Sequence, residues 1–204
     1  MNAIDYKSLK KDFRKFIKNQ IMVMSPETVQ AHSLSIQLNL IHFLKNYDFI
    51  NQQKSQIWGS YQALGTEPQV NFEVIETVLE PHLQIAYPLT QDDTLQFYSN
   101  VEQWKVSSLC VREPVVGQKI EIQDIAGLII PGLAFNKSGH RLGRGMGYYD
   151  KSFQKFQGPK IGLCYEINFL NNVPYESHDL CMDYVITEKQ VYKIDKIHKQ
   201  ENSK

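Results

Sequence analysis

Residues 139–150 combine glycines with arginines, a pairing suited to binding an anion. In order, the segment contains Gly139, Arg141, Gly143, Arg144, Gly145, Gly147, Tyr148, Tyr149 and Asp150. A glycine lets the backbone come within hydrogen-bonding reach of a ligand, because it has no Cβ and tolerates positive φ. The planar guanidinium group of arginine matches the oxygens of a phosphate or a carboxylate. The segment therefore predicts a binding loop for an anion.

The residues before this loop predict a buried strand that leads into it. Residues 125–130 form an apolar run, which stops at Pro131-Gly132. Open α/β sheets bind nucleotides beyond the carboxyl ends of their strands, so this position favours a nucleotide site. The spacing Gly143-x-Gly145-x-Gly147 matches neither the Walker A sequence nor the dinucleotide fingerprint. On spacing alone, a surface turn with an arginine salt bridge remains the alternative.

The remaining elements alternate between helical and strand patterns. Helices are expected over residues 6–18, 26–44, 71–80 and 148–156, the second with Ser25 as N-cap and Pro26 at its first position. Strands are expected over residues 56–61, 83–87, 94–98, 125–130, 160–165 and 183–187. This order predicts one α/β domain over residues 1–204, with a mostly parallel central sheet, helices on both faces and a Rossmann-like three-layer arrangement. The polar tail, residues 189–204, is a candidate for fraying.

Composition and charge restrict the function classes. The chain has 204 residues, of which 42% are hydrophobic and 22% charged, as is usual for a globular protein with one core. Its formal net charge is zero, so no overall field attracts nucleic acid or an acidic membrane. The N-terminus lacks the apolar region of a signal peptide, and the longest apolar run is too short to span a bilayer. We therefore expect a monomeric, cytoplasmic protein with no nucleic-acid or membrane partner.

The order of residues around the loop resembles the signature of a known enzyme family. Residues 131–135 read Pro-Gly-Leu-Ala-Phe, and residues 139–150 read Gly-x-Arg-Leu-Gly-Arg-Gly-x-Gly-Tyr-Tyr-Asp. Both closely resemble the signature of the 5-formyltetrahydrofolate cyclo-ligase family, also called methenyltetrahydrofolate synthetase. The flanks are similar as well, with Lys10-x-x-Phe13-Arg14, Glu113-Pro114, Ile161-Gly162-Leu163, His178-Asp179 and Asp183-Tyr184-Val185-Ile186-Thr187. The resemblance covers nearly the whole chain, strongly from Glu113 onward and loosely before it.

This resemblance implies an ATP-dependent ligation on a folate. In the implied reaction, 5-formyltetrahydrofolate, with or without a polyglutamate tail, cyclises to 5,10-methenyltetrahydrofolate while ATP is converted to ADP and phosphate. The formyl oxygen attacks the γ-phosphate, N10 closes on the activated carbon, and phosphate leaves. Phosphoryl transfer requires mainly positioning and charge neutralisation, which the backbone N–H and guanidinium groups of the loop would supply. Mg²⁺ is the implied cofactor and ATP the co-substrate.

The resemblance also assigns residues to ATP binding and to catalysis. It implies that ATP contacts Lys10, Arg14, Arg141, Leu142, Gly143, Arg144, Gly145, Met146, Gly147, Tyr148 and Tyr149. Arg144 and Arg141 are the implied catalytic residues, because they would neutralise the charge that develops on the phosphate. Lys10 and Arg14 lie four positions apart and so share a helix face, although basic residues on such a helix are often only a solvated surface. Met146 departs from the family, where Lys or Gly is frequent, and cannot donate to phosphate.

Two aspartates are the implied magnesium ligands. Asp150 and Asp179 would hold Mg²⁺ together with the ATP phosphates, since Mg²⁺ prefers oxygen ligands and rarely uses a full protein cage. As an alternative, Asp150 caps a helix that begins near Lys151. Asp183 lies close to Asp179 in the sequence and is the alternative second ligand. His178 is expected to be a hydrogen-bonding neighbour rather than a ligand.

Three residues are the implied contacts of the folate: Tyr61, Glu67 and Tyr148. A carboxylate suits the pterin ring, whose amino group and ring N–H form a donor edge. The chain departs from the family directly after Glu67, where Pro68 begins a different sequence from the usual Val-x-Thr. Core packing is the more frequent fate of aromatic residues. The aromatic candidates for stacking on the pterin are Tyr61, Phe135, Tyr148 and Tyr149.

Two other function classes remain open at this point. A phosphosugar isomerase or CoA-transferase-like enzyme would share the α/β architecture without needing Mg²⁺ and ATP. A non-enzymatic protein that binds single-stranded nucleic acid would use the Arg-Gly and Tyr-Tyr residues for charge and base stacking. The zero net charge and the single Arg-Gly cluster disfavour this second class. The folate enzyme is therefore the leading hypothesis.

Overall fold

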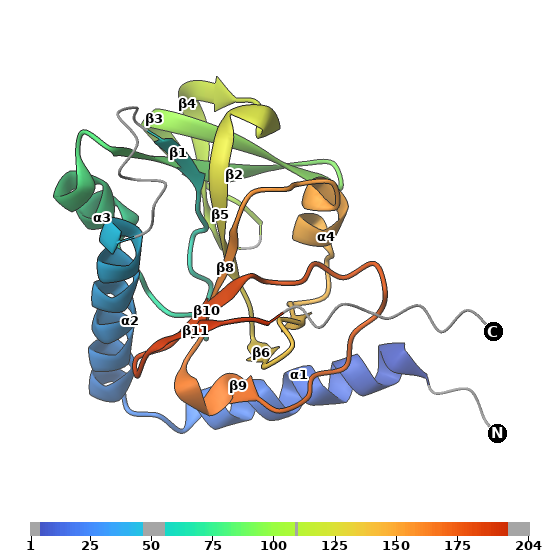
Figure 1. Cartoon of the computed structure of the whole chain (residues 1–204). Helices are drawn as coiled ribbons and strands as arrows, with labels where there is room; N and C mark the ends of the chain where they lie inside the picture. The colour runs from blue at the N-terminus through green and yellow to red at the C-terminus, as the bar shows by residue number, and fades with distance from the viewer. Residues whose placement is uncertain (1–4, 47–55, 109, 196–204) are drawn as a thin grey trace.

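The computed structural model describes residues 5–46, 56–108 and 110–195 (Figure 1). Its helices are α1 (Tyr6–Met22), α2 (Pro26–Asn46), α3 (Phe72–Leu79) and α4 (Tyr148–Phe153), with 3-10 turns at Ile122–Asp124 and Glu166–Asn168. Its strands are β1 (Gln56–Gly59), β2 (Leu83–Gln91), β3 (Thr94–Val106), β4 (Arg112–Ile120), β5 (Ile125–Pro131), β6 (Ala134–Asn136), β7 (Arg141–Leu142), β8 (Lys160–Leu163), β9 (Phe169–Leu170), β10 (Tyr184–Ile186) and β11 (Val191–Lys193). None of the described helices is long and apolar enough to cross a membrane.

Within the described ranges, the central sheet has eight strands in the order β11-β10-β8-β5-β1-β2-β3-β4. The five neighbouring strands from β10 to β2 run parallel. β3 and β4 pair antiparallel at one edge, and β11 pairs antiparallel at the other. The sheet is therefore mixed, which corrects the prediction of a mostly parallel sheet. The short turn at Asp92-Asp93 is one cause, because so short a link between β2 and β3 permits only an antiparallel neighbour.

The β3–β4 edge differs most from the expected pattern of strands. β3 runs from Thr94 to Val106, well beyond the expected residues 94–98. No strand was expected over Arg112–Ile120, where the structure has β4. In β4, Val115 and Val116 are exposed while Glu113 is buried. Its residues therefore do not alternate as they do in a strand with one apolar face, and its sequence gives no strand signal. β4 is a strand because it pairs with β3, and not because of a pattern in its own sequence.

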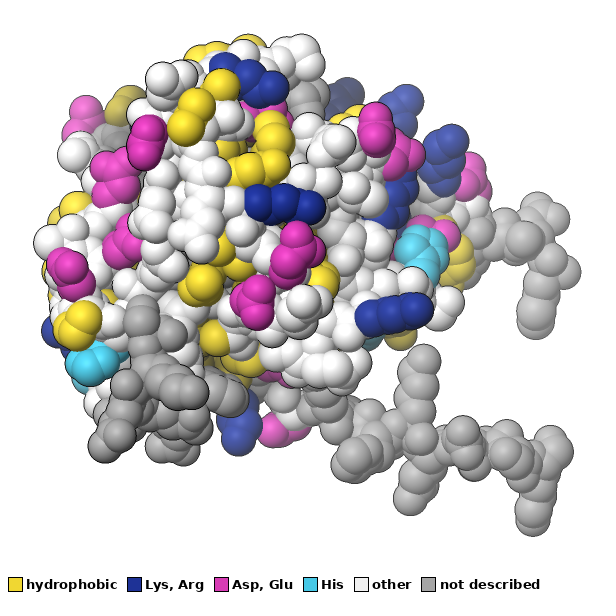
Figure 2. Space-filling model, turned by 90° about the horizontal axis from the view of Figure 1, so that it is seen from above, with side chains coloured by type: hydrophobic (Ala, Val, Ile, Leu, Met, Phe, Trp, Pro, Cys, Tyr) yellow, Lys and Arg dark blue, Asp and Glu magenta, His cyan; other side chains and the backbone are white. Residues whose placement is uncertain are grey.

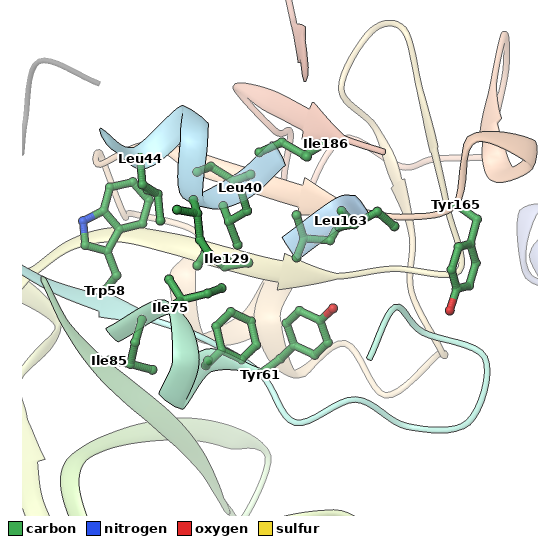
Figure 3. Close-up of a cluster of buried hydrophobic side chains, with 14 of the residues drawn as sticks. Leu40, Leu44, Trp58, Tyr61, Ile75, Ile85, Ile129, Leu163, Tyr165 and Ile186 are labelled. Atoms are coloured by element: carbon green, nitrogen blue, oxygen red, sulfur yellow. The ribbon is translucent and has the colours of Figure 1, made fainter. Parts of the chain in front are cut away.

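Helices cover both faces of the sheet, as predicted. α2 and α3 lie on one face and α4 on the other (Figure 1). Side chains alternate along β5, so that Ile129 packs in the cluster that contains α2 and α3, whereas Leu128 and Ile130 pack with Phe153 of α4. Figure 3 shows the first cluster, with Leu40 of α2 beside Ile129. Burial of both faces explains the continuous apolar runs in the central strands and confirms the three-layer arrangement.

The first two helices begin at side-chain caps. Ser25 accepts a hydrogen bond from the backbone N–H of Thr28 at 3.2 Å, and Pro26 is the first residue of α2, which confirms the predicted cap. Asp5 caps α1 by accepting from the backbone N–H of Lys7 at 3.1 Å. α1 buries Ile17 in the same cluster as α2 and α3. The helix is thereby fixed beside the rest of the domain.

The glycine loop and the C-terminal segment are held by short strands. β6 and β7 follow β5 in the sequence, and they form a small separate sheet with β9, which comes after β8. At the C-terminal end, residues 191–193 form β11 and pair with β10. This part of the tail 189–204, for which fraying was expected, is therefore an edge strand of the sheet. Residues 196–204, the end of the expected tail, lie outside the described residues.

Candidate active site

A cleft of about 730 Å³ lies among α1, the segment after β1, the strands β2 to β4, the glycine loop and the segment after β9. The predicted site residues that line it are Lys10, Arg14, Tyr61, Glu67, Arg141, Leu142, Gly143, Arg144, Gly145, Met146, Gly147, Tyr148, Tyr149, Asp150 and Asp179. Lys10 and Asp179 are 169 positions apart in the sequence, yet their side chains are in contact. The fold therefore brings all of these residues into one cavity.

The loop requires glycine at two positions that line the cleft. Gly145 has φ of +111° and Gly147 has φ of +71°, a region that residues with a Cβ rarely adopt. A Cβ on Gly145 would also lie 3.4 Å from the guanidinium carbon of Arg14. Gly147 is the N-cap of α4, so the loop passes directly into the first turn of that helix. Met146 lies between them and is 53% exposed.

The two arginines of the loop are each fixed by a carboxylate. Arg141 Nη2 donates to Asp150 Oδ2 at 2.7 Å, and Arg144 Nε donates to Glu67 Oε1 at 2.6 Å. Arg141 also donates to the Pro131 carbonyl at 3.2 Å. Within the described part of the chain, Arg144 Nη2 and Arg141 Nε are buried nitrogens without a hydrogen-bond partner. Both guanidinium groups are thus positioned and keep a donor available for a ligand.

α1 contributes Lys10 and Arg14 to the cleft. Lys10 Nζ contacts Asp179 at 2.6 Å and Glu176 at 2.8 Å, and Arg14 Nε donates to the Gly143 carbonyl at 2.8 Å. Burial alone would lower the pKa of Lys10, but these two carboxylates outweigh it and raise the pKa above its ordinary value. Burial lowers the pKa of Arg14, partly offset by the charge of Asp179. For these two residues the solvated-surface interpretation is wrong.

The two aspartates predicted to bind magnesium both line the cleft. Asp150 accepts from Arg141 and from the backbone N–H of Leu180 at 3.0 Å. α4 begins at Tyr148 with Gly147 as N-cap, so the alternative that Asp150 caps this helix is wrong. Asp183 accepts from the backbone N–H of Lys160 at 2.9 Å and is not among the cleft-lining residues.

Asp179 belongs to a group of possible ligand residues at one end of the cleft. One ligand atom from each of Glu176, His178 and Asp179 lies within 4.8 Å of the others. Asp179 accepts from the backbone N–H of Glu176 at 2.8 Å. His178 Nε2 lies 3.7 Å from Asp179 Oδ1, which is too far for the expected hydrogen bond. The oxygens of Asp150, Asp179 and Glu176 are the donor type that Mg²⁺ prefers. The residues present therefore fit a divalent cation bound together with phosphates.

The predicted folate contacts lie around the segment after β1. Glu67 is 4% exposed, and its second carboxylate oxygen accepts from the backbone N–H of Leu64 at 2.9 Å. Tyr61 donates to the Pro68 carbonyl at 2.8 Å, and burial raises its pKa well above the ordinary value. Pro68, where the sequence departs from the family, thus still offers a backbone oxygen that orients Tyr61. Tyr148 lines the cleft next to the loop.

The other aromatic candidates differ in position. Phe135 is completely buried and lies under Gly132 and Gly162, where a Cβ would meet its ring at 2.6 Å and 2.4 Å. Phe135 is therefore a core residue and does not line the cleft. The ring of Tyr149 lies 5.5 Å from the guanidinium carbon of Arg141, and burial raises its pKa above the ordinary value. Tyr149 thus supports the arginine as well as the cleft wall.

Two parts of the cleft wall have contrasting chemistry. We call Lys10, Arg14, Arg141 and Arg144 the arginine wall. We call Pro88, Thr90, Leu95, Val111 and Glu113 the sheet wall. The roles of the sheet-wall residues and of Glu176 were missed by sequence reasoning. Glu113 was recognised only as part of the Glu113-Pro114 match, which was the one signal that marked it.

Charged side chains are mixed in sign on the face shown in Figure 2. On this face the described Lys and Arg side chains stand among Asp and Glu side chains rather than in a basic stripe. A nucleic-acid-binding face usually gathers basic residues into a patch or stripe. This face does not have that character.

Comparison with known proteins identifies a family. The sequence profile of the 5-formyltetrahydrofolate cyclo-ligase family matches residues 6–188. The chain is 25% identical over 201 residues to the 5-formyltetrahydrofolate cyclo-ligase of Mus musculus, covering 92% of this chain and 98% of the mouse protein. It is 23% identical over 181 residues to the Escherichia coli protein of the same name, covering 84% of this chain and 86% of that protein.

A solved structure agrees with the sequence comparison. The NMR structure of Aquifex aeolicus 5,10-methenyltetrahydrofolate synthetase is similar with a TM-score of 0.75 and 25% sequence identity. The similarity covers 91% of this chain and 93% of the Aquifex chain. The profile match extends from α1 to beyond β10 and so includes every predicted site residue that lines the cleft. The chain therefore belongs to the 5-formyltetrahydrofolate cyclo-ligase family.

Proposed function

We propose that the protein catalyses the ATP- and Mg²⁺-dependent cyclisation of 5-formyltetrahydrofolate to 5,10-methenyltetrahydrofolate, with release of ADP and phosphate. The observation that carries this proposal is the single cleft in which the glycine loop and four cationic side chains meet Tyr61 and Glu67. Family membership supports the same reaction. ATP is the proposed co-substrate, and the folate carries either one glutamate or a polyglutamate tail.

The arginine wall is the proposed binding site for the ATP phosphates. Arg144 Nη2 and Arg141 Nε are buried donors without a partner among the described residues, which supports an anionic ligand at this wall. The backbone of residues 141–149 and the side chains of Lys10 and Arg14 complete the proposed site. Charge that develops on the transferred phosphoryl group would be neutralised by Arg144 and Arg141.

Asp150 and Asp179 are the proposed magnesium ligands. In the structure, Asp150 is paired with Arg141 and Asp179 with Lys10. Both cations are also proposed phosphate ligands, so the carboxylates and the phosphates share one charged network. Bound magnesium would add neutralisation of the phosphate charge to this network. Leu180 holds Asp150 through its backbone N–H, and Glu176 holds Asp179 in the same way.

The folate is proposed to lie along Tyr61, Glu67 and Tyr148. The formyl oxygen at N5 attacks the γ-phosphorus, and the bond from phosphorus to the β-phosphate oxygen breaks. The N10 lone pair then attacks the activated formyl carbon, phosphate leaves with the former formyl oxygen, and N10 loses its proton. Because Glu67 fixes Arg144 at 2.6 Å, it couples the folate side of the cleft to the phosphate side.

The alternative functions make different demands on the site. The reactions of a phosphosugar isomerase or CoA-transferase-like enzyme need neither Mg²⁺ nor ATP, so they would give the proposed metal and phosphate ligands no role. A single-stranded nucleic-acid binder would need aromatic side chains and cations along a groove. The mixed charges of Figure 2 do not favour such a groove on that face. The family match over residues 6–188 favours the folate enzyme over both.

An omission assay tests the proposed function. Purified protein is mixed with 5-formyltetrahydrofolate, ATP and Mg²⁺, and the absorbance of methenyltetrahydrofolate is followed. We expect product only when all three are present, and we expect no shift of a single-stranded oligonucleotide. Product without ATP, or no product in the complete mixture, would refute the proposal. The monomeric state and the cytoplasmic location both remain predictions. Size-exclusion chromatography with light scattering would test the first, and cell fractionation would test the second.

A further inference from the structure

β4 contains a carboxylate in a position where an apolar residue would be expected. Glu113 is 6% exposed, whereas Val115 and Val116 of the same strand are 52% and 41% exposed. Burial of a charged side chain is costly unless partners compensate for lost water, while burial of valine is favourable. This strand therefore buries the residue type that folding alone disfavours and exposes the type that it favours. A functional role would account for this inversion.

The contacts of Glu113 in the structure are long. Its Oε1 accepts from the backbone N–H of Thr90 at 3.3 Å, and its Oε2 lies 3.9 Å from Nζ of Lys105, whose side chain is 55% exposed. Glu67, the other buried glutamate of the cleft, has contacts of 2.6 Å and 2.9 Å on its two oxygens. An ionised carboxylate accepts about four hydrogen bonds. Glu113 thus retains more acceptor capacity than Glu67.

The surroundings of Glu113 suit a flat, uncharged ring. Glu113 lines the cleft together with Pro88, Thr90, Leu95 and Val111, the remaining residues of the sheet wall. Thr90 and Leu95 are directly paired across β2 and β3, so they form a continuous surface. The side chains of the arginine wall come from α1 and the glycine loop instead. The cleft therefore offers cations for phosphate on one part of its wall and an acceptor beside apolar side chains on another.

We propose that Glu113 is a substrate-binding residue that accepts hydrogen bonds from the 2-amino group and neighbouring ring N–H of the pterin. This inference rests on the proposed function, because the pterin is the ring of the proposed substrate. Two adjacent donors match the two oxygens of one carboxylate. The adenine of ATP lacks this pair of adjacent donors, so Glu113 also determines which ligand occupies the sheet wall. Glu67 keeps its contact with Arg144, and it affects folate binding by holding that arginine in place.

The variant Glu113→Gln tests this role, since it keeps the size of the side chain and removes its charge and one acceptor. We expect the KM for 5-formyltetrahydrofolate to rise about 10- to 100-fold, the loss typical of a hydrogen bond to a charged group. We expect the KM for ATP to stay unchanged and kcat to change far less than the folate KM. A merely structural role would not separate the two KM values in this way.

Matched variants separate binding from folding. Glu121→Gln changes an exposed glutamate just after β4 and should leave both KM values unchanged. Lys105→Met removes the distant cation but leaves the carboxylate, so the folate KM should not rise. Glu113→Asp keeps the charge with a shorter reach and should lie between wild type and Glu113→Gln. Melting temperatures of all variants would reveal any that fail to fold.

A folate analogue identifies the interacting group. With the 2-desamino-2-methyl analogue of 5-formyltetrahydrofolate as a competitive ligand, the loss caused by Glu113→Gln should be much smaller than with the natural folate, because only one of the two donors, the ring N–H, remains. An equal loss on both ligands, an unchanged folate KM, or an equal rise in the ATP KM would overturn the role of Glu113. If wild type gives no methenyltetrahydrofolate at all, the proposed function fails first. Calorimetric binding of the folate to wild type and Glu113→Gln would then still decide the role of Glu113.

Discussion

The arginine wall and the sheet wall of the cleft are built in different ways. Arg141 and Arg144 come from one continuous segment, and carboxylates hold them at 2.7 Å and 2.6 Å. The sheet wall comes from separate strands, and its glutamate has contacts of only 3.3 Å and 3.9 Å. Short ion pairs position the charges of the first wall before a ligand arrives. In the second wall the acceptor is under-used, which is what we expect where the ligand itself supplies the donors.

The largest expected effect comes from breaking the arginine wall. Arg144→Ala removes a guanidinium group that is proposed to neutralise developing charge, so kcat should fall about 10²- to 10³-fold. Circular dichroism should show an unchanged fold, because Arg144 lies at the surface of the cleft with a side chain 25% exposed. A kcat close to that of wild type would remove Arg144 from the catalytic residues.

Asp150→Asn tests whether this wall also carries the metal. The Mg²⁺ concentration that gives half-maximal rate should rise about tenfold or more, since a charged oxygen ligand is lost. Asp183→Asn is the matched control, because Asp183 pairs with Lys160 away from the cleft-lining residues. It should leave the Mg²⁺ titration unaltered. If Asp150→Asn also leaves it unaltered, Asp150 serves only to hold Arg141 and Leu180.

Glu67→Gln probes the point where the two walls are coupled. Glu67 contacts Arg144 and lies on the folate side of the cleft, so its charge matters for both. We expect the folate KM to rise roughly tenfold, more than the ATP KM, with a fall in kcat that Glu113→Gln does not show. Equal increases in the two KM values would mean that Glu67 is structural and that its place among the folate contacts is wrong.

The smallest effect concerns a half-buried glutamate that serves the fold alone. Glu76 of α3 accepts from the backbone N–H of Ile85 in β2 at 3.0 Å, and it does not line the cleft. Burial raises the pKa of Glu76 above its ordinary value of 4.5, and the hydrogen bond from Ile85 offsets only part of this rise. Its folded-state pKa therefore lies above its unfolded-state pKa. Ionised Glu76 consequently costs stability at neutral pH.

Glu76→Gln should therefore be slightly more stable than wild type at neutral pH. The difference in unfolding free energy should shrink as pH falls through the folded pKa, and vanish below the ordinary value of 4.5. Both KM values should remain those of wild type, in contrast to Glu113→Gln. Denaturant titrations over this pH range would measure the difference. A difference that grows toward acid pH would mean that the sign of the pKa shift is wrong.

The fold could be predicted where sequence patterns are local. Ser25 and Pro26 marked the start of α2, and the apolar run of β5 marked a strand buried on both faces. The antiparallel edge could not be predicted, because β4 buries Glu113 and exposes Val115, against the usual pattern. Its pairing with β3 is a tertiary property that no single segment contains. The mixed character of the sheet follows from that edge.

The site residues also divide into those that lie in one local segment and those that only the tertiary fold brings together. The glycine loop and Asp150 lie in one segment whose order resembles a family signature, so the whole group was predicted together. Lys10 and Asp179 were found through matches at the two ends of the chain, and the fold brings them to 2.6 Å from each other. The roles of Glu113 and Glu176 depend on which strands and loops meet at the cleft. Sequence spacing does not contain that information.

The most direct test of the account compares the two products in wild-type protein. Phosphate and methenyltetrahydrofolate are measured in the same reaction with 5-formyltetrahydrofolate, ATP and Mg²⁺. If one cleft couples phosphoryl transfer to ring closure, the two should form in equal amounts and neither should form without both substrates. Phosphate release that is independent of the folate, or methenyltetrahydrofolate formed without ATP hydrolysis, would contradict the account.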